Sequence, residues 1–193
     1  MSYSITSKPK EYEAILNVSN ELNFSMISDE EVGVLLRLLT SSKKEGEILE
    51  LGTGTGLALA WILDGLHPRG KIISIENDPQ FVKVARSFFD KESRVKILQE
   101  DAGVWIEKNK HRQFDLIFAD TWAGKFTHLN QTLQMVKPGG FCIIDDLNRQ
   151  ENWPEGHQDK VIFLMEELKC QTSFSALPID FGTGIMVLCR KFD

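Results

Sequence analysis

Short apolar runs alternate along the chain with segments in which apolar side chains recur every three or four positions. Five of the apolar runs are predicted to be strands: 48–51, 72–75, 95–98, 114–119 and 141–144. The segments predicted to be helices between and after them are 57–63, 81–88, 104–106, 129–136 and 161–168. Such alternation is typical of a parallel sheet with helices on both faces.

Both ends of the chain extend this pattern. Helices within about residues 10–40 are predicted to precede the sheet. The late apolar runs 174–177 and 184–190 are joined by too few residues for a crossover helix, so they predict an antiparallel hairpin at one side of the sheet. A turn at 137–140 is expected before the fifth strand. Because no linker divides the chain, we expect residues 1–193 to form one doubly wound α/β domain.

The composition narrows the class of partner. Of the 193 residues 42% are hydrophobic, and the formal net charge is -6. This charge argues against nucleic acid as a partner, because such binding needs clustered Lys and Arg. Three widely spaced cysteines in apolar surroundings favour buried thiols over disulfides. Since no apolar run is long enough to cross a bilayer, we expect a cytoplasmic protein without a membrane partner.

Acidic residues stand at or beside the end of each predicted parallel strand. They are Glu50, Glu76, Asp101, Asp120, and Asp145 with Asp146. In an open parallel sheet these ends share one edge, where ligands bind. Any one of these acids is equally well explained as a helix N-cap or a turn residue. Five strand ends in step predict an acidic pocket.

A glycine-rich turn, GTGTG at 52–56, follows the first strand. Its spacing differs from the G-x-G-x-x-G of dinucleotide enzymes, because Leu57 stands in the place of the third glycine. It is not a P-loop either, since no Gly-Lys-Ser/Thr follows. The acidic surroundings disfavour a phosphate and favour a cationic, phosphate-free nucleoside. S-adenosylmethionine has those properties.

Five segments in order resemble the motifs of class I S-adenosylmethionine-dependent methyltransferases. They are EILELGTGTG at 47–56, IISIENDP at 72–79, QEDA at 99–102, FDLIFAD at 114–120 and KPGGFCIIDD at 137–146. Within that class the pattern is most similar to the bacterial and catechol-type O-methyltransferases, over about residues 30–193. The resemblance implies a Rossmann-like sheet of seven strands, mostly parallel, whose last strand is antiparallel.

The resemblance also implies where the methyl donor lies. The residues that it places near the methionine part are Gly52, Thr53, Gly54 and Gly56. It implies that Glu50 fixes the turn or the amino group, and that Glu76 holds the ribose hydroxyls. At the adenine it places Asn77, Asp101 and Ala102, and at the meeting point of donor and acceptor it places Asp120.

Two devices for activating an acceptor hydroxyl follow from the same resemblance. Metal-dependent members of the family place oxygen ligands where this chain has Asp120, Asp145 and Asp146, although the third is commonly Asn. Such ligands suit a divalent cation, for example Mg²⁺. The alternative is that Asp120 binds the methionine ammonium while Asp145 and Asp146 cap or turn the chain.

The second device is a base. The family often has Lys three positions after the strand-four Asp, but here that position is Ala123 and the nearest lysine is Lys125. Lys125 is therefore a candidate base, and the alternative is a solvated loop lysine. A second candidate, His157, ends the irregular stretch 152–157, which is expected to cover the acceptor. Trp122 and Trp153 either wall a planar acceptor or pack in loops.

These features predict an enzyme that transfers a methyl group from S-adenosylmethionine to a hydroxyl of a small molecule, with metal assistance left open. One alternative is a metal-free N-methyltransferase, and another is a protein that binds S-adenosylmethionine without catalysis. An NAD oxidoreductase is disfavoured by the missing third glycine and the missing basic phosphate contact. The resemblance further suggests a homodimer. The sequence does not identify the acceptor.

Overall fold

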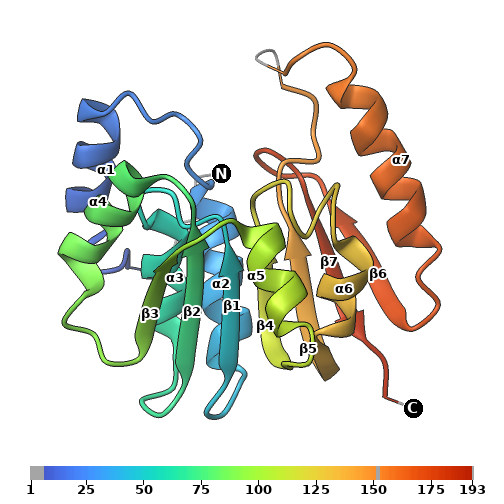
Figure 1. The fold of residues 1–193 in the computed structure, drawn as a ribbon, viewed down its shortest axis with the longest axis horizontal. Helices are drawn as coiled ribbons and strands as arrows, with labels where there is room; N and C mark the ends of the chain where they lie inside the picture. Colours follow the sequence, from blue (N-terminus) through green and yellow to red (C-terminus); the bar gives the residue numbers. More distant parts are fainter. Residues whose placement is uncertain (1–6, 151–152, 193) are drawn as a thin grey trace.

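The computed structural model describes residues 7–150 and 153–192, and within them seven strands form one sheet (Figure 1). The strands are β1 (Glu47–Leu51), β2 (Lys71–Glu76), β3 (Val95–Gln99), β4 (Phe114–Ala119), β5 (Val136–Ile144), β6 (Phe174–Ile179) and β7 (Ile185–Arg190). Their order across the sheet is β3-β2-β1-β4-β5-β7-β6. Neighbours among β1 to β5 are parallel, whereas β7 is antiparallel to both β5 and β6. The predicted fold class and the late hairpin are confirmed.

Helices cover both faces of the sheet, as a doubly wound fold requires. They are α1 (Tyr12–Glu21), α2 (Glu30–Ser41), α3 (Leu57–Gly65), α4 (Pro79–Phe89), α5 (Ala102–Asn109), α6 (Leu129–Gln134) and α7 (His157–Lys169). Buried side chains of α1 to α4 share one hydrophobic cluster, and those of α5 to α7 share the other. None of the helices in the described part of the chain is long and apolar enough to cross a membrane.

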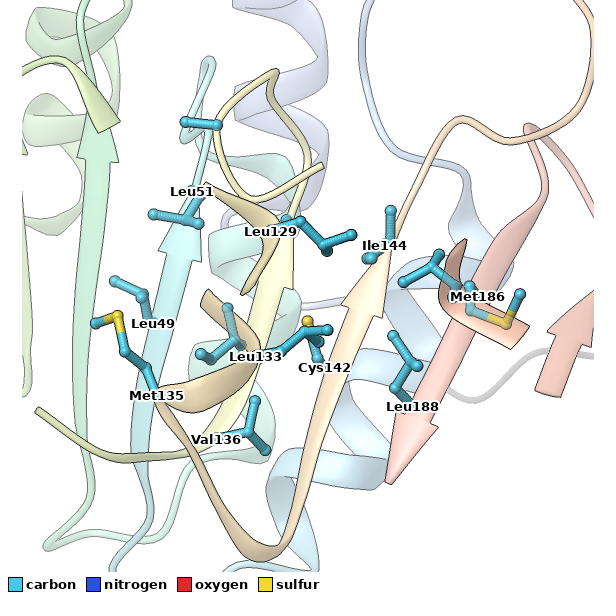
Figure 2. Close-up of a cluster of buried hydrophobic side chains, with 14 of the residues drawn as sticks. Leu49, Leu51, Leu129, Leu133, Met135, Val136, Cys142, Ile144, Met186 and Leu188 are labelled. Carbon is cyan, nitrogen blue, oxygen red and sulfur yellow. The ribbon is translucent and has the colours of Figure 1, made fainter. Parts of the chain in front are cut away.

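Alternation along each strand divides the core between these two clusters. In β1, Ile48 packs with α1 to α4, while Leu49 and Leu51 pack on the opposite face. Figure 2 shows this second cluster, in which Leu49 and Leu51 lie near Leu129 and Leu133 of α6. Because the central strands β1 and β4 are buried on both faces, they have the continuous apolar runs seen in the sequence, whereas the edge strand β3 is partly exposed.

The helix predicted at 129–136 is too long. The helix α6 ends at Gln134, and Val136 begins β5, where it pairs with Phe114. The predicted turn at 137–140 is part of β5, and there the pairing with β4 shifts register between Phe114 and Leu116. Pro138 has no N–H for the sheet, and Gly139 takes a φ of +73°, so the strand is irregular at this point.

The strand order places a topological switch at β1, whose neighbours β2 and β4 lie on opposite sides. The crossovers leave β1 and β4 in opposite directions, so their carboxyl ends open a crevice between the following loops. The glycine turn after β1 and the loop after β4 meet there. A Cβ built on Gly52 would lie 2.6 Å from the backbone oxygen of Asp120.

Candidate active site

Two cavities lie at the carboxyl ends of the parallel strands, with volumes of about 520 and 370 Å³. Both are lined by Gly52, Glu76, Asn77, Thr121 and Trp122, so they form two halves of one cleft. The smaller half continues toward α5. The larger half continues toward the ends of β4 and β5 and the start of α7.

The glycine turn depends on backbone angles that glycine adopts readily. Gly52, Gly54 and Gly56 have φ values of +97°, +51° and +100°. Gly52 and Gly54 line the larger cavity together with Thr53. Gly56 lines neither cavity, since a Cβ on it would lie 2.9 Å from the ring of Phe89 on α4. Its position serves helix packing, and the predicted approach of Gly56 to a ligand has no support in this geometry.

A buried hydrogen-bond network links the glycine turn to β1 and β2. Glu50 accepts a hydrogen bond from the hydroxyl of Ser74, which also contacts the hydroxyl of Thr53. Burial raises the pKa of Glu50 to about 8, an effect that the Ser74 hydrogen bond partly offsets. The Oε1 atom of Glu50 has no hydrogen-bond partner among the described residues. Glu50 lines neither cavity, so its contacts match the predicted fixing of the turn rather than a direct ligand contact.

The carboxylate of Glu76 lies at the middle of the cleft and is ringed by backbone donors. Its Oε2 accepts from the N–H of Gly54 at 2.8 Å, and its Oε1 accepts from those of Asn77 and Asp78 at 2.9 Å each. A carboxylate has about four acceptor sites, so about one remains for a ligand hydroxyl. Glu76 therefore holds the glycine turn and faces the cleft at once.

The smaller cavity is lined by the predicted adenine residues Asn77, Asp101 and Ala102. Asp101 is also the N-cap of α5, since its Oδ1 accepts from the N–H of Val104 at 2.8 Å. Asp101 therefore caps α5 and lines the cavity at once. Asp78 likewise caps α4, since its Oδ1 accepts from the N–H groups of Gln80 and Phe81, and it lines the larger cavity.

Three carboxylates line the far end of the larger cavity: Asp120, Asp145 and Asp146. The Oδ1 of Asp145 accepts from the N–H of Asp146 at 2.8 Å and from the hydroxyl of Thr183 at 2.9 Å. Burial and the charge of the nearby Asp146 together raise the pKa of Asp145 to about 6. Burial and the charge of Asp145 also raise the pKa of Asp120 well above its usual range.

Lys125 reaches into this acidic end. Its side chain is only 5% exposed, so the alternative of a solvated loop lysine is wrong. The Nζ atom donates to the backbone oxygen of Asp145 at 2.8 Å and lies 3.5 Å from Oδ2 of Asp146. The loop that carries it is tightly folded, because the N–H groups of residues 125, 126 and 127 all donate to the carbonyl of Trp122.

His157 is the first residue of α7, and three aromatic rings surround it. Its ring centroid lies 4.5 Å from that of Trp153, 5.2 Å from that of Phe126 and 5.8 Å from that of Trp122. Burial lowers the pKa of His157, and the charges of Lys125 and Lys160 lower it further. The imidazole is therefore neutral at neutral pH. Residue 152 of the stretch expected to cover the acceptor lies outside the described residues.

Several cleft residues come from segments that carry no motif. Ser28 donates to Oδ2 of Asp120 at 3.4 Å, Gln150 donates to Oδ1 of Asp146 at 3.1 Å, and Thr183 contacts Asp145. Phe24 packs on Phe81 and faces Gly54. Sequence reasoning missed all four residues, because only the fold brings these short polar and aromatic side chains to the cleft.

A family model described as O-methyltransferase matches residues 10–192. The chain belongs to the O-methyltransferase family. Among curated relatives, a catechol O-methyltransferase of Niastella koreensis is 29% identical over 124 residues, which are 61% of this chain and 56% of that protein. The family assignment covers the whole cleft described above.

Solved structures of O-methyltransferases share the fold. An O-methyltransferase from Bacillus cereus, solved in complex with SAH, has a TM-score of 0.84 and 21% identity, and the match covers 97% of this chain and 94% of that one. The O-methyltransferase TomG from Streptomyces achromogenes, solved with SAM, has a TM-score of 0.84 and 19% identity, covering 98% and 93%. Both comparisons confirm the Rossmann-like architecture.

Proposed function

We propose that this O-methyltransferase moves the methyl group of S-adenosylmethionine to a hydroxyl of a small molecule. The observation that carries the proposal is the cleft, whose two halves share lining residues and are lined by Asp120 and by all the residues predicted for the donor except Glu50 and Gly56. The solved complexes of the Bacillus cereus and Streptomyces achromogenes proteins with SAH and SAM support it. A small acceptor agrees with the volume of the larger cavity, about 520 Å³.

The residues of the cleft fit S-adenosylmethionine in three places. The turn from Gly52 to Gly54 lines the larger cavity and suits the methionine part. Glu76 has an acceptor site left for a ribose hydroxyl. Asn77 and Ala102 border the smaller cavity, where the adenine would lie. When bound, S-adenosylmethionine supplies a methyl group on a positively charged sulfur, which the acidic cleft favours.

His157 is the residue we propose to accept the proton of the acceptor hydroxyl. Its lowered pKa keeps the imidazole neutral and able to take a proton. Lys125 is less suited to this role, because its Nζ already donates to a carbonyl and lies beside a carboxylate, as an ammonium does. Trp122 and Trp153 flank His157 and would exclude water from the acceptor.

The divalent cation predicted on Asp120, Asp145 and Asp146 stays a prediction, and these residues fit it poorly as they lie. Hard cations need several oxygens converging at about 2.0–2.6 Å. Across residues 7–150 and 153–192, no group of three or more His, Cys, Asp or Glu side chains is arranged to hold a metal. We therefore derive no step through a metal. The homodimer and the cytoplasmic location also stay predictions.

The proposal is tested by measuring S-adenosylmethionine affinity calorimetrically for the wild type and for Glu76→Ala. The substitution removes the acceptor for a ribose hydroxyl and the partner of the Gly54 N–H. Hydrogen bonds to charged groups contribute about 1.5–3 kcal/mol, so affinity should fall roughly 10- to 150-fold. Glu100→Gln is the matched control, since it removes another negative charge that lines the cleft.

Methyl transfer itself is tested on a panel of phenols, catechols and amines, with products identified by mass spectrometry. Methylated hydroxyls are expected, and His157→Gln should lower kcat on the order of 100-fold or more while leaving S-adenosylmethionine affinity unchanged. Transfer to amines only would exclude the hydroxyl assignment. Equal affinity of the wild type and Glu76→Ala would exclude the proposed donor site.

A further inference from the structure

The ammonium group of Lys125 lies at the acidic end of the cleft, next to the predicted metal ligands. Lys125 lies on the loop after β4, and Asp145 and Asp146 follow β5. Its Nζ lies 2.8 Å from the backbone oxygen of Asp145 and 3.5 Å from Oδ2 of Asp146. The ammonium therefore bridges the ends of two adjacent strands, in the same cavity that Asp120, Asp145 and Asp146 line.

Burial makes this ammonium a fixed part of the site. With 5% of the side chain exposed, the charge of Lys125 is removed from most of its water, and such a charge needs negative partners. Asp146 is the direct partner at 3.5 Å, and the charge of Lys125 also favours the ionised forms of Asp120 and Asp145. The ammonium thus offsets part of the negative charge of the three acids.

The oxygens of the three acids are, in addition, turned toward other donors. Asp145 Oδ1 is held by the N–H of Asp146 and by Thr183, and Asp146 Oδ1 is held by Gln150. A dication near these groups would have to displace those donors and would be repelled by the adjacent ammonium. Both effects act against a metal while Lys125 is present.

We propose that the ammonium of Lys125 is the resident cation of the acceptor site and stands in place of a divalent metal. The proposal rests on the proposed function, since the ammonium then acts on the bound acceptor. An ammonium has three N–H donors, and Lys125 lines the larger cavity, so it can donate to the acceptor oxygen. A positive charge beside that oxygen favours its deprotonated form.

The atoms balance without a metal. The acceptor O–H bond breaks and its proton passes to the neutral imidazole of His157. The oxygen forms a bond to the methyl carbon while the carbon–sulfur bond breaks, and its electron pair stays on sulfur, which becomes a neutral thioether. Lys125 keeps its protons throughout. The imidazolium then returns the proton to water, so no oxidant or further reactant is needed.

The test uses Mn²⁺ as the probe and reads binding separately from activity. Calorimetry with Mn²⁺ is run on the full chain for the wild type, Lys125→Met and Lys160→Met. We expect the wild type to show no stoichiometric Mn²⁺ binding at 1 mM. This concentration is the upper end of the Kd range of weak metal sites, about 10⁻⁴–10⁻³ M. Lys125→Met removes the competing charge and should gain at least tenfold in Mn²⁺ affinity. Lys160, whose Nζ lies over the ring of Trp122, is the control and should gain nothing.

Activity gives the second arm. Wild type treated exhaustively with chelator should keep its kcat within twofold, and added Mg²⁺ or Mn²⁺ should not raise it. Lys125→Arg, which keeps the charge, should retain more activity than Lys125→Met. If Lys125→Met does not fold, as judged by its melting temperature, Lys125→Gln takes its place in the titration.

Stoichiometric Mn²⁺ binding by wild type, loss of activity on chelation with recovery on metal addition, or no gain by a folded Lys125 variant would each overturn the proposal. The Mn²⁺ titration does not require turnover. A wild type that neither binds S-adenosylmethionine nor transfers methyl groups would therefore defeat the proposed function, while the titration still decides the role of Lys125.

Discussion

The two halves of the cleft are built in different ways. The donor half is built largely from backbone: Gly52 and Gly54 at positive φ and a ring of N–H groups around Glu76. The acceptor half consists of side chains from distant segments, among them Lys125, Asp145 and Thr183. Backbone contacts tolerate few substitutions and leave a recognisable motif. Side-chain contacts between distant segments, such as that of Thr183 with Asp145, leave no local motif.

The largest expected effect on ligand binding is a loss of S-adenosylmethionine affinity caused by a substitution at Gly52 in the donor half. Gly52→Ala places a Cβ 2.6 Å from the backbone oxygen of Asp120, which cannot move without shifting the end of β4. We expect S-adenosylmethionine affinity, measured by calorimetry, to fall about 100-fold, which corresponds to roughly 2.7 kcal/mol.

Gly156→Ala is the matched control for that substitution. Gly156 also has a positive φ, +78°, but no heavy atom lies within 4 Å of its Cβ position. Both variants carry the backbone strain of a left-handed alanine, about 1–2 kcal/mol, and only one carries the clash. An equal loss of affinity in the two variants would show that strain alone is responsible.

A second effect, on stability, comes from the buried support of the glycine turn. Because the pKa of Glu50 is raised to about 8 from 4.5, the folded chain keeps its proton over a pH range where the unfolded chain has lost it. The contribution of Glu50 to stability is therefore fully present below pH 4.5 and is lost as the pH rises through about 8.

Glu50→Gln should remove this dependence. As the pH rises from 5 to 8.5, the unfolding free energy of the variant should gain on the order of 4 kcal/mol relative to that of the wild type, as measured by urea unfolding. The control is Glu47→Gln, a change at the partly exposed start of the same strand. Parallel pH profiles for the wild type and Glu50→Gln would mean that Glu50 ionises normally in the folded chain.

The smallest expected effect lies in the acceptor half. Thr183→Val keeps the shape of the side chain but removes the hydroxyl that donates to Asp145. Unfolding free energy at pH 8 should fall by about 1 kcal/mol, and S-adenosylmethionine affinity should not change.

Thr132→Val is the comparison, because the hydroxyl of Thr132 is buried and has no partner among the described residues. Its loss should be neutral or stabilising. If Thr132→Val and Thr183→Val were equally destabilised, the hydrogen bond from Thr183 to Asp145 would not explain the loss of unfolding free energy.

The sequence predicted the fold and the donor half better than the acceptor half. Buried parallel strands produce apolar runs, and the residues at their carboxyl ends lie at one edge of the sheet whatever the conformation of the loops. The sequence therefore predicts that Glu76, Asp120 and Asp145 share one pocket, and all three line the larger cavity. The boundary at Val136 was missed, because a strand that begins before a proline and two glycines resembles the end of a helix. The different roles of Gly54 and Gly56 could not be predicted either. Gly54 lines the cavity, whereas Gly56 packs against Phe89, and the sequence alone does not show that contact.

The burial of Lys125 could not be predicted for a different reason. Its place depends on the turn of residues 122–127, whose N–H groups converge on one carbonyl, and on the carbonyl of Asp145 twenty positions later. Composition favours a solvated lysine, because burying this charge is unfavourable unless specific partners are present. Those partners are defined only by the ends of β4 and β5 together.

The contact between Thr183 and Asp29 bears on how the enzyme is made. The N–H of Thr183 donates to Oδ2 of Asp29 at 2.7 Å across 154 positions, and the Thr183 hydroxyl binds Asp145. The turn between β6 and β7 thus joins the start of α2 to the end of β5. During synthesis, when chains fold from the N-terminus at about 5–20 residues per second, the donor half is complete in sequence many seconds before Thr183 leaves the ribosome. A nascent chain stalled before that point has its glycine turn but lacks the Thr183 contacts that join α2 to the end of β5, so the acceptor half is the last part of the cleft to be completed.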